Sequence, residues 1–183
     1  GGLKDGDLCI GDVIVPRQVD AYDETGKIHE KDERPRWQRR GSSYSPSPYL
    51  VVDVQQLEHT ARADFVRWTD DGADQLNSLR VGPDRPRIAK LVSSKLLRVR
   101  PIVNTSHLAS GSFVIASKTF AEFVREANAD RFAAEMEAAG MMAASEYLRD
   151  PPTTLVVRGI SDHVDADKKE VDTIGNGALR RLA

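Results

Sequence analysis

The sequence lacks most features that mark secreted, membrane-spanning or metal-dependent proteins. Its single cysteine, Cys9, cannot form an internal disulfide, so a reducing, cytoplasmic location is expected. No apolar run approaches the ~20 residues that cross a bilayer, and no signal-peptide pattern opens the chain, so no membrane association is expected. The four histidines are dispersed without zinc-like spacing, which disfavours a metal site.

An excess of charge of one sign is also absent. The 26 basic and 28 acidic residues leave a net charge of −2, which gives no general attraction to nucleic acid or to anionic lipid. A basic run at residues 34–40 surrounds Trp37, but a solvated loop with one packed aromatic explains it better than a nucleic-acid site. There is no GxxxxGK[ST] motif, so hydrolysis of ATP at a phosphate-binding loop is disfavoured.

The 183 residues, 40% hydrophobic and 30% charged, fit one ordinary globular α/β domain spanning residues 1–183. A charged and then Gly/Ser/Pro-rich stretch predicts a loop-rich insertion around residues 24–49. Apolar patterns predict strands and an amphipathic helix in the remainder. The strands are expected at Val13–Val15, Val99–Val103 and Ser112–Ala116, the helix at Thr119–Asn128, and a polar turn at Asn104–Gly111.

The stretch Ala134–Val164 carries the strongest pattern. It begins with a helix rich in alanine and glycine, whose backbone can lie close to a sheet. The apolar run Leu155–Val157, continued by Ile160, is typical of a strand covered on both faces in a parallel sheet. Ligands bind beyond the carboxyl ends of strands in open α/β sheets. Glu137, near the helix start, and Asp162, after the strand, are therefore expected to converge on one crevice.

Both acids also have a plainer interpretation. Asp162 could cap the turn that follows it. Glu137 could be a first-turn carboxylate that the helix dipole stabilises. The residue pattern alone leaves these alternatives open.

Four motifs, taken in order, carry a family resemblance. They are GDVIV at Gly11–Val15 with Tyr22–Asp23 after it, SGSFVI at Ser110–Ile115, EMEAAG at Glu135–Gly140 and ISDH at Ile160–His163. Together they resemble the nucleoside phosphorylase/nucleosidase family, which includes purine nucleoside phosphorylases and 5'-methylthioadenosine/S-adenosylhomocysteine nucleosidases. The resemblance covers most of the chain at motif level. It implies a three-layer α/β/α fold with a central mixed sheet.

The sequence departs from the family pattern in two places. Gly1–Gly2 resembles the end of a glycine turn that follows the first strands in the family. The chain is therefore expected to lack the amino-terminal strands of the domain and to have little activity alone. Ser112 stands where the family has the aspartate of its SGD motif.

The resemblance assigns roles to the two acids. Asp162 is implied as the catalytic acid at purine N7, and Glu137 as the acceptor for the ribose 2'- and 3'-hydroxyls, which suits a carboxylate with two acceptor oxygens. The other implied substrate-binding residues are Glu135, Met136, Ser161, Phe113, Val114 and Ile115. Ser161 is expected to orient Asp162, Met136 to pack under the sugar, and the last three residues to form a wall for the base.

The implied reaction is cleavage of the N-glycosidic bond of a purine nucleoside or nucleotide, by hydrolysis or phosphorolysis. No cofactor is implied, apart from inorganic phosphate as a co-substrate in phosphorolysis. The resemblance also implies a homo-oligomer. The alternative is a catalytically weak sensing or assembly module for nucleosides or nucleotides within a larger signalling or defence protein, for which Ser112 is one motivation.

Overall fold

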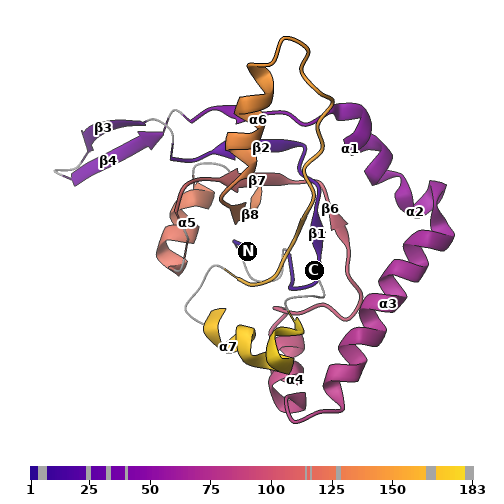
Figure 1. Cartoon of the computed structure of the whole chain (residues 1–183). Coiled ribbons are helices and arrows are strands. Elements are labelled where there is room, and N and C mark those ends of the chain that lie inside the picture. The colour runs from indigo at the N-terminus through magenta and orange to yellow at the C-terminus, as the bar shows by residue number, and fades with distance from the viewer. Residues whose placement is uncertain are drawn as a thin grey trace.

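The computed structural model describes residues 1–3, 8–23, 26–31, 34–39, 41–113, 115, 117–126, 129–163 and 168–179. These ranges contain short strands and helices, with a run of strands first, a run of helices next and a mixture of both after residue 93 (Figure 1). In chain order the elements are β1 (Val13–Ile14), β2 (Gln18–Ala21), β3 (Gly26–Lys31), β4 (Arg34–Arg39), β5 (Ser43–Tyr44), α1 (Pro48–Gln55), α2 (Leu57–Thr60), α3 (Arg62–Arg80), α4 (Arg85–Ser93), β6 (Val103–Asn104), β7 (His107–Ser110), α5 (Lys118–Glu126), β8 (Arg131–Glu135), α6 (Ala138–Glu146), β9 (Arg158–Gly159), α7 (Lys168–Thr173) and the 3-10 turn η1 (Ile174–Gly177).

The main sheet has the strand order β5-β2-β7-β8. Strands β2, β7 and β8 run parallel, and β5 pairs antiparallel with β2 at one edge, so the sheet is mixed as predicted. Ala21 lies opposite Ser110, and Ser110 lies opposite Glu135. The three parallel strands therefore end at the same level.

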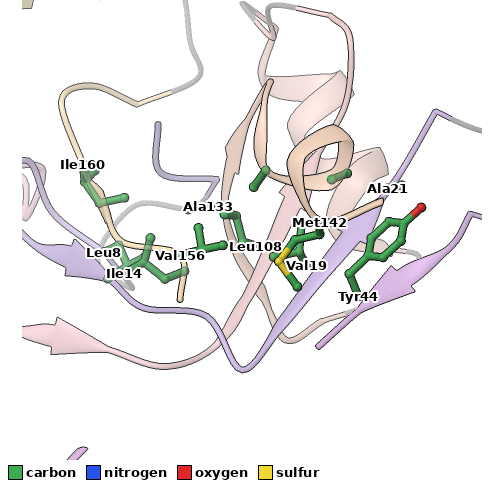
Figure 2. Packing of buried hydrophobic residues seen from close by; sticks show 12 residues of the cluster. Leu8, Ile14, Val19, Ala21, Tyr44, Leu108, Ala133, Met142, Val156 and Ile160 are labelled. Carbon is green, nitrogen blue, oxygen red and sulfur yellow. The ribbon is translucent and has the colours of Figure 1, made fainter. Parts of the chain in front are cut away.

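Helix α6 covers one face of this sheet. Side chains alternate between the faces of a sheet, and Val19, Leu108 and Ala133 point to the same side. They belong to a buried cluster with Ala139 and Met142 of α6, and Figure 2 shows Met142 beside Val19 and Leu108. The small residues of α6 fit this close contact, as the alanine-rich sequence predicts.

Helix α5 covers the opposite face. Ala109 of β7 and Ala134 of β8 alternate with the residues that face α6, and they pack against Ala121 and Val124 of α5. The amphipathic pattern predicted this helix, and the described part of it, Lys118–Glu126, is confirmed. The sheet with α6 on one side and α5 on the other makes three layers, which confirms the predicted α/β/α architecture.

A smaller sheet has the order β6-β1-β9, with β1 parallel to β6 and antiparallel to β9. Helices α3 and α4 and the carboxy-terminal segment contribute to a separate buried cluster. Its members are Ile10, Leu76, Ile88, Leu97, Val171, Ile174 and Leu179.

Strands β3 and β4 form an antiparallel hairpin that extends away from the main sheet in Figure 1. The insertion around residues 24–49 therefore contains a hairpin within its described part.

Asp12 is a buried carboxylate that joins the turn before β1 to the segment before β6. It accepts the backbone N–H groups of Cys9 at 2.8 Å and Ile102 at 3.0 Å, and Arg98 Nε at 3.1 Å. Burial raises the pKa of Asp12, although these donors act in the opposite direction. The Cys9 thiol is buried beside it and donates to the carbonyl of Lys95 at 3.2 Å.

The structure corrects the prediction of a buried parallel strand at Leu155–Ile160. The strand in this region is β9, Arg158–Gly159, and it pairs antiparallel with β1. Only one side of the run is covered: Val156 and Ile160 are buried, whereas Val157 is exposed. An apolar run of this length does not distinguish a strand buried on both faces from a segment that packs on one side.

The strand at positions 107–110 was predicted as part of a polar turn, and the strand expected at Ser112–Ala116 is absent from the described residues 112, 113 and 115. Strand β7 forms because β2 pairs with one of its edges and β8 with the other. The local strand propensity of its residues does not predict this pairing. The strand expected at Val99–Val103 begins only at Val103.

Among the described residues, no helix combines the length and apolar character needed to cross a membrane.

Candidate functional site at the ends of the parallel strands

The candidate site lies where β2, β7 and β8 end together. The backbone pairing continues past the strands, since Tyr22 N–H donates to Ser110 O at 3.0 Å and Gly111 N–H donates to Glu135 O at 3.1 Å. The chain segments that leave this edge carry the motif residues Asp23, Ser112, Phe113, Met136 and Glu137. Three of the four motifs thus meet at the carboxyl edge of a parallel sheet, the place where such sheets bind ligands.

Glu135 is a buried carboxylate that caps α6. Its side chain is 5% exposed, and it accepts the backbone N–H groups of Glu137 at 2.9 Å and Ala138 at 3.0 Å. Burial alone would raise its pKa, but the hydrogen bonds from Ser110 and from these two N–H groups outweigh burial and lower the pKa of Glu135. An ionised carboxylate at this position stabilises the positive end of the helix dipole.

Ser110 joins the same network from β7. Its hydroxyl is buried, accepts the N–H of Ala139 at 2.9 Å, and is also hydrogen-bonded to Glu135. One hydroxyl therefore connects the end of β7, the end of β8 and the first turn of α6. These contacts fix the start of α6, and with it the position of Glu137.

Glu137 is the N-cap residue of α6, and its side chain is 67% exposed. Arg158 of β9 donates from Nη2 to Glu137 Oε2 at 2.9 Å, and the same nitrogen lies 3.8 Å from Glu135 Oε2. Met136, between the two glutamates, is 44% exposed. The structure thus keeps Glu135 inside as a structural cap and presents Glu137 to solvent.

Asp162 and Ser161 lie on the far side of the segment Gly1–Leu3. Gly1–Leu3 pairs antiparallel with β8, and Gly2 N–H donates to Asp162 O at 2.9 Å. Two strand spacings of ~5 Å therefore separate the backbone at Asp162 from β8, about 10 Å in all. Asp162 is buried, and Ser161 Oγ donates to Asp162 Oδ2 at 2.9 Å.

The three residues expected to form a wall for the base differ in their surroundings. The Phe113 side chain is 63% exposed, whereas Ile115 is buried in the cluster beneath α5. Val114 lies outside the described residues. Of the two described members, Phe113 alone is accessible to a ligand.

The loop at Gly111 packs directly against a buried aromatic ring. A Cβ added at Gly111 would lie 2.4 Å from Tyr22 Cζ, and Tyr22 is 1% exposed and so has no room to withdraw. We therefore expect Gly111→Ala to lower the free energy of unfolding by about 1–3 kcal/mol through overpacking, measured by urea denaturation.

Gly140 supplies the matched control. It lies inside α6, and an added Cβ there would meet nothing within 4 Å. Gly140→Ala is expected to stabilise the protein by about 0.5–1 kcal/mol, since alanine is the better helix former. Equal stabilities for the two variants would contradict the close packing of Gly111 on Tyr22.

A buried ion pair supports the strands below the site. Arg131 Nε donates to Asp20 Oδ2 at 2.8 Å, and Arg131 Nη1 donates to the carbonyl of Val124 at 3.0 Å. Asp20 also accepts Gln18 Nε2 at 2.6 Å and Ser43 Oγ at 2.8 Å. Because these groups come from α5, β2, β5 and β8, the pair ties the sheet to the α5 layer.

Sequence reasoning gave no role to Ser110, Arg158 or Tyr22. All three lie inside or next to the quoted motifs, but nothing in the spacing shows that Arg158 reaches Glu137 or that Ser110 reaches α6. Among the residues with described side chains, no group of three or more His, Cys, Asp and Glu could hold a metal ion.

No family model and no curated protein matches the sequence. Solved structures do match. The chain superposes over 100% of its length on the 5'-methylthioadenosine/S-adenosylhomocysteine nucleosidase of Neisseria meningitidis in complex with methylthio-immucillin-A, with a TM-score of 0.52 and 16% identity, covering 64% of that chain. The S-adenosylhomocysteine nucleosidase of Streptococcus pyogenes in complex with 5-methylthiotubericidin gives a TM-score of 0.55 and 18% identity. The match covers 100% of this chain and 61% of that chain.

The futalosine hydrolase of Helicobacter pylori gives a TM-score of 0.50 and 15% identity, with 100% of this chain covering 60% of that one. The chain thus spans less than two thirds of the length of these structures. At such identities the likeness concerns the fold, and it agrees with the three-layer arrangement and the mixed sheet described above. The chain has the fold of the nucleoside phosphorylase/nucleosidase family.

Proposed function

We propose that the protein carrying this chain cleaves the N-glycosidic bond of a purine nucleoside or nucleotide. The observation that carries the proposal is the common end of β2, β7 and β8, which gathers the SGSFVI and EMEAAG motifs at one edge. The backbone at Asp162 lies about 10 Å from β8, beyond the paired segment Gly1–Leu3. Glu137 and Asp162 thus flank the backbone of Gly1–Leu3, and the nucleoside is placed over this segment, with its sugar toward Glu137 and its base toward Asp162. The nucleosidase fold supports the same reaction class.

Glu137 is the residue we assign to the sugar. Its carboxylate is exposed, Arg158 holds one of its oxygens at 2.9 Å, and α6 begins beside it. A carboxylate has acceptor capacity for several donors, so the Arg158 contact is compatible with hydrogen bonds from ribose hydroxyls. Glu135 acts on the sugar only indirectly, because it accepts the N–H groups of Glu137 and Ala138 and so holds the backbone at Glu137 in place.

Asp162 is the residue we assign to the leaving base. Breaking the bond leaves negative charge on the purine and an oxocarbenium-like centre on the sugar, as in sugar hydrolysis. A proton delivered or shared at N7 neutralises the purine as it departs, which is general acid catalysis. Ser161 supports this role because its hydroxyl donates to one oxygen of Asp162, so that the carboxyl group keeps one orientation.

The test is release of free purine base. The full-length protein that carries this chain would be incubated with adenosine, methylthioadenosine and ATP, each with and without inorganic phosphate, and the base separated by chromatography. Free base that appears only with phosphate indicates phosphorolysis, and free base in its absence indicates hydrolysis. If no substrate yields base and none binds, the proposal is wrong.

The second candidate is a binding module without turnover. It is favoured by Ser112, which stands in place of the family's aspartate and offers its backbone N–H to Asp23. Calorimetry with the same three compounds separates the candidates, since saturable binding without base release supports the module. Size-exclusion chromatography with light scattering would test the expected homo-oligomer.

A further inference from the structure

Two consecutive residues at the end of β2 hold the loop Gly111–Phe113 from one side. The Tyr22 hydroxyl donates to the carbonyl of Phe113 at 3.1 Å. The Asp23 carboxylate accepts the backbone N–H of Ser112. Together with the packing of Gly111 on the Tyr22 ring, each of the three loop residues is contacted by Tyr22 or Asp23.

Tyr22 itself is held rigidly. Its ring is buried beneath α5 in the cluster that contains Ile115, and it packs edge-on against Phe120 at a centroid distance of 6.2 Å. Its backbone N–H continues the sheet by donating to Ser110 O. The hydroxyl that reaches Phe113 therefore extends from a fixed platform, and not from a surface side chain.

The Phe113 side chain remains 63% exposed although its backbone is held. It follows Ser110 by three residues, and Ser110 is in register with Glu135 at the edge that carries Glu137. Aromatic faces bind nucleic-acid bases by stacking, and a ring whose backbone is fixed loses less freedom when a base binds.

We propose that Tyr22 and Asp23 are positioning residues for base recognition, which hold Phe113 at the strand-end edge for contact with the purine. This inference rests on the proposed function. Neither residue touches the reacting bond: Tyr22 acts through the Phe113 carbonyl, and Asp23 through the Ser112 N–H. Both are therefore expected to affect affinity for the base much more than the chemical step.

The test compares Tyr22→Phe, Asp23→Ala and Asp23→Asn. Loss of one hydrogen bond is expected to raise KM, and the dissociation constant of free adenine, by roughly three- to tenfold in Tyr22→Phe and Asp23→Ala, with kcat changed less than about twofold. Asp23→Asn keeps an oxygen that can accept the Ser112 N–H and should rescue most of the loss. Tyr147→Phe is the matched control, because Tyr147 is 91% exposed on the C-terminal side of α6.

The measured KM, kcat and adenine affinity either support or overturn the positioning role of Tyr22 and Asp23. An unchanged KM and adenine affinity in Tyr22→Phe and Asp23→Ala overturns the inference, as does a fall in kcat with unchanged KM. If the wild-type protein releases no base, the proposed reaction is wrong, and adenine binding by calorimetry then decides the positioning role by the same three- to tenfold criterion. A wild-type protein that binds no adenine overturns both. Melting temperatures within a few degrees of wild type exclude a general loss of folding as the cause.

Discussion

Asp162→Asn is expected to slow release of the purine base by a factor of about 10²–10⁴, the range that a positioned general acid contributes. Asparagine has nearly the same shape, and its side-chain oxygen can still accept the Ser161 hydroxyl that Asp162 accepts at 2.9 Å. The backbone contact from Gly2 N–H to Asp162 O does not involve the side chain. The variant should therefore fold, and the rate should report the loss of the proton donor.

Asp53→Asn provides the matched control, because Asp53 is an exposed residue of α1. Its rate of base release should equal that of the wild type. The measurement is single-turnover base release at saturating substrate, with the near-ultraviolet circular dichroism spectrum as a check on folding. Full activity of Asp162→Asn would show that another group protonates the base, and Asp162 would then be a structural residue at the edge of the sheet.

Arg131→Met is expected to lower the free energy of unfolding by about 3–5 kcal/mol, since it removes the positive charge that balances the buried Asp20 carboxylate. Asp20 is 2% exposed, and Arg131 is its charged hydrogen-bond donor at 2.8 Å. His107 Nδ1, 3.8 Å from the same Asp20 oxygen, is charged only when protonated. The loss also removes the contact from Arg131 to the Val124 carbonyl, so strand β8 and helix α5 should loosen together.

The matched control for this loss is Arg17→Met. Arg17 and Asp130 form an ion pair of similar length, 3.1 Å, but their side chains are 57% and 58% exposed. Exposed pairs contribute only about 0–1 kcal/mol, so this variant should unfold at nearly the wild-type urea concentration. Comparable losses in the two variants would mean that burial does not govern the Asp20–Arg131 pair.

The cost of Arg131→Met is expected to shrink as the pH falls. Burial by itself would raise the pKa of Asp20, but hydrogen bonds from Gln18, Arg131 and Ser43 outweigh burial and lower the pKa below its ordinary value. A carboxyl group of this kind adds stability above its unfolded pKa of about 3.9, and the stability is lost as the pH falls through the folded value. Without Arg131, a protonated Asp20 is less costly than a charged one.

Urea denaturation of both proteins at neutral pH and at about pH 4 measures this change. Asp12 has a raised pKa and so contributes in the opposite direction, but it is present in both proteins and cancels in the difference. A difference in unfolding free energy that stays constant with pH would contradict the assignment to Asp20.

The elements that local pattern predicted correctly are those whose periodicity is strong. Phe120, Phe123 and Val124 follow a helical spacing and lie in α5, and the alanine-rich segment after Glu137 is α6. Strand β7 was missed because its four residues, His-Leu-Ala-Ser, carry little strand propensity. It is a strand because of pairing on both edges, which local sequence does not encode.

By itself, the sequence determined the order of the motifs and the two helices that cover the main sheet, and it indicated Glu137 and Asp162 as the candidate acids. The tertiary structure alone decided that Ala21, Ser110 and Glu135 end in register, that Glu135 caps α6 while Glu137 faces solvent, and that Tyr22 and Asp23 hold the loop at Phe113. The physical reason is that parallel strands pair segments far apart in the chain, so their register and the side-chain contacts at their ends are set by packing between distant segments.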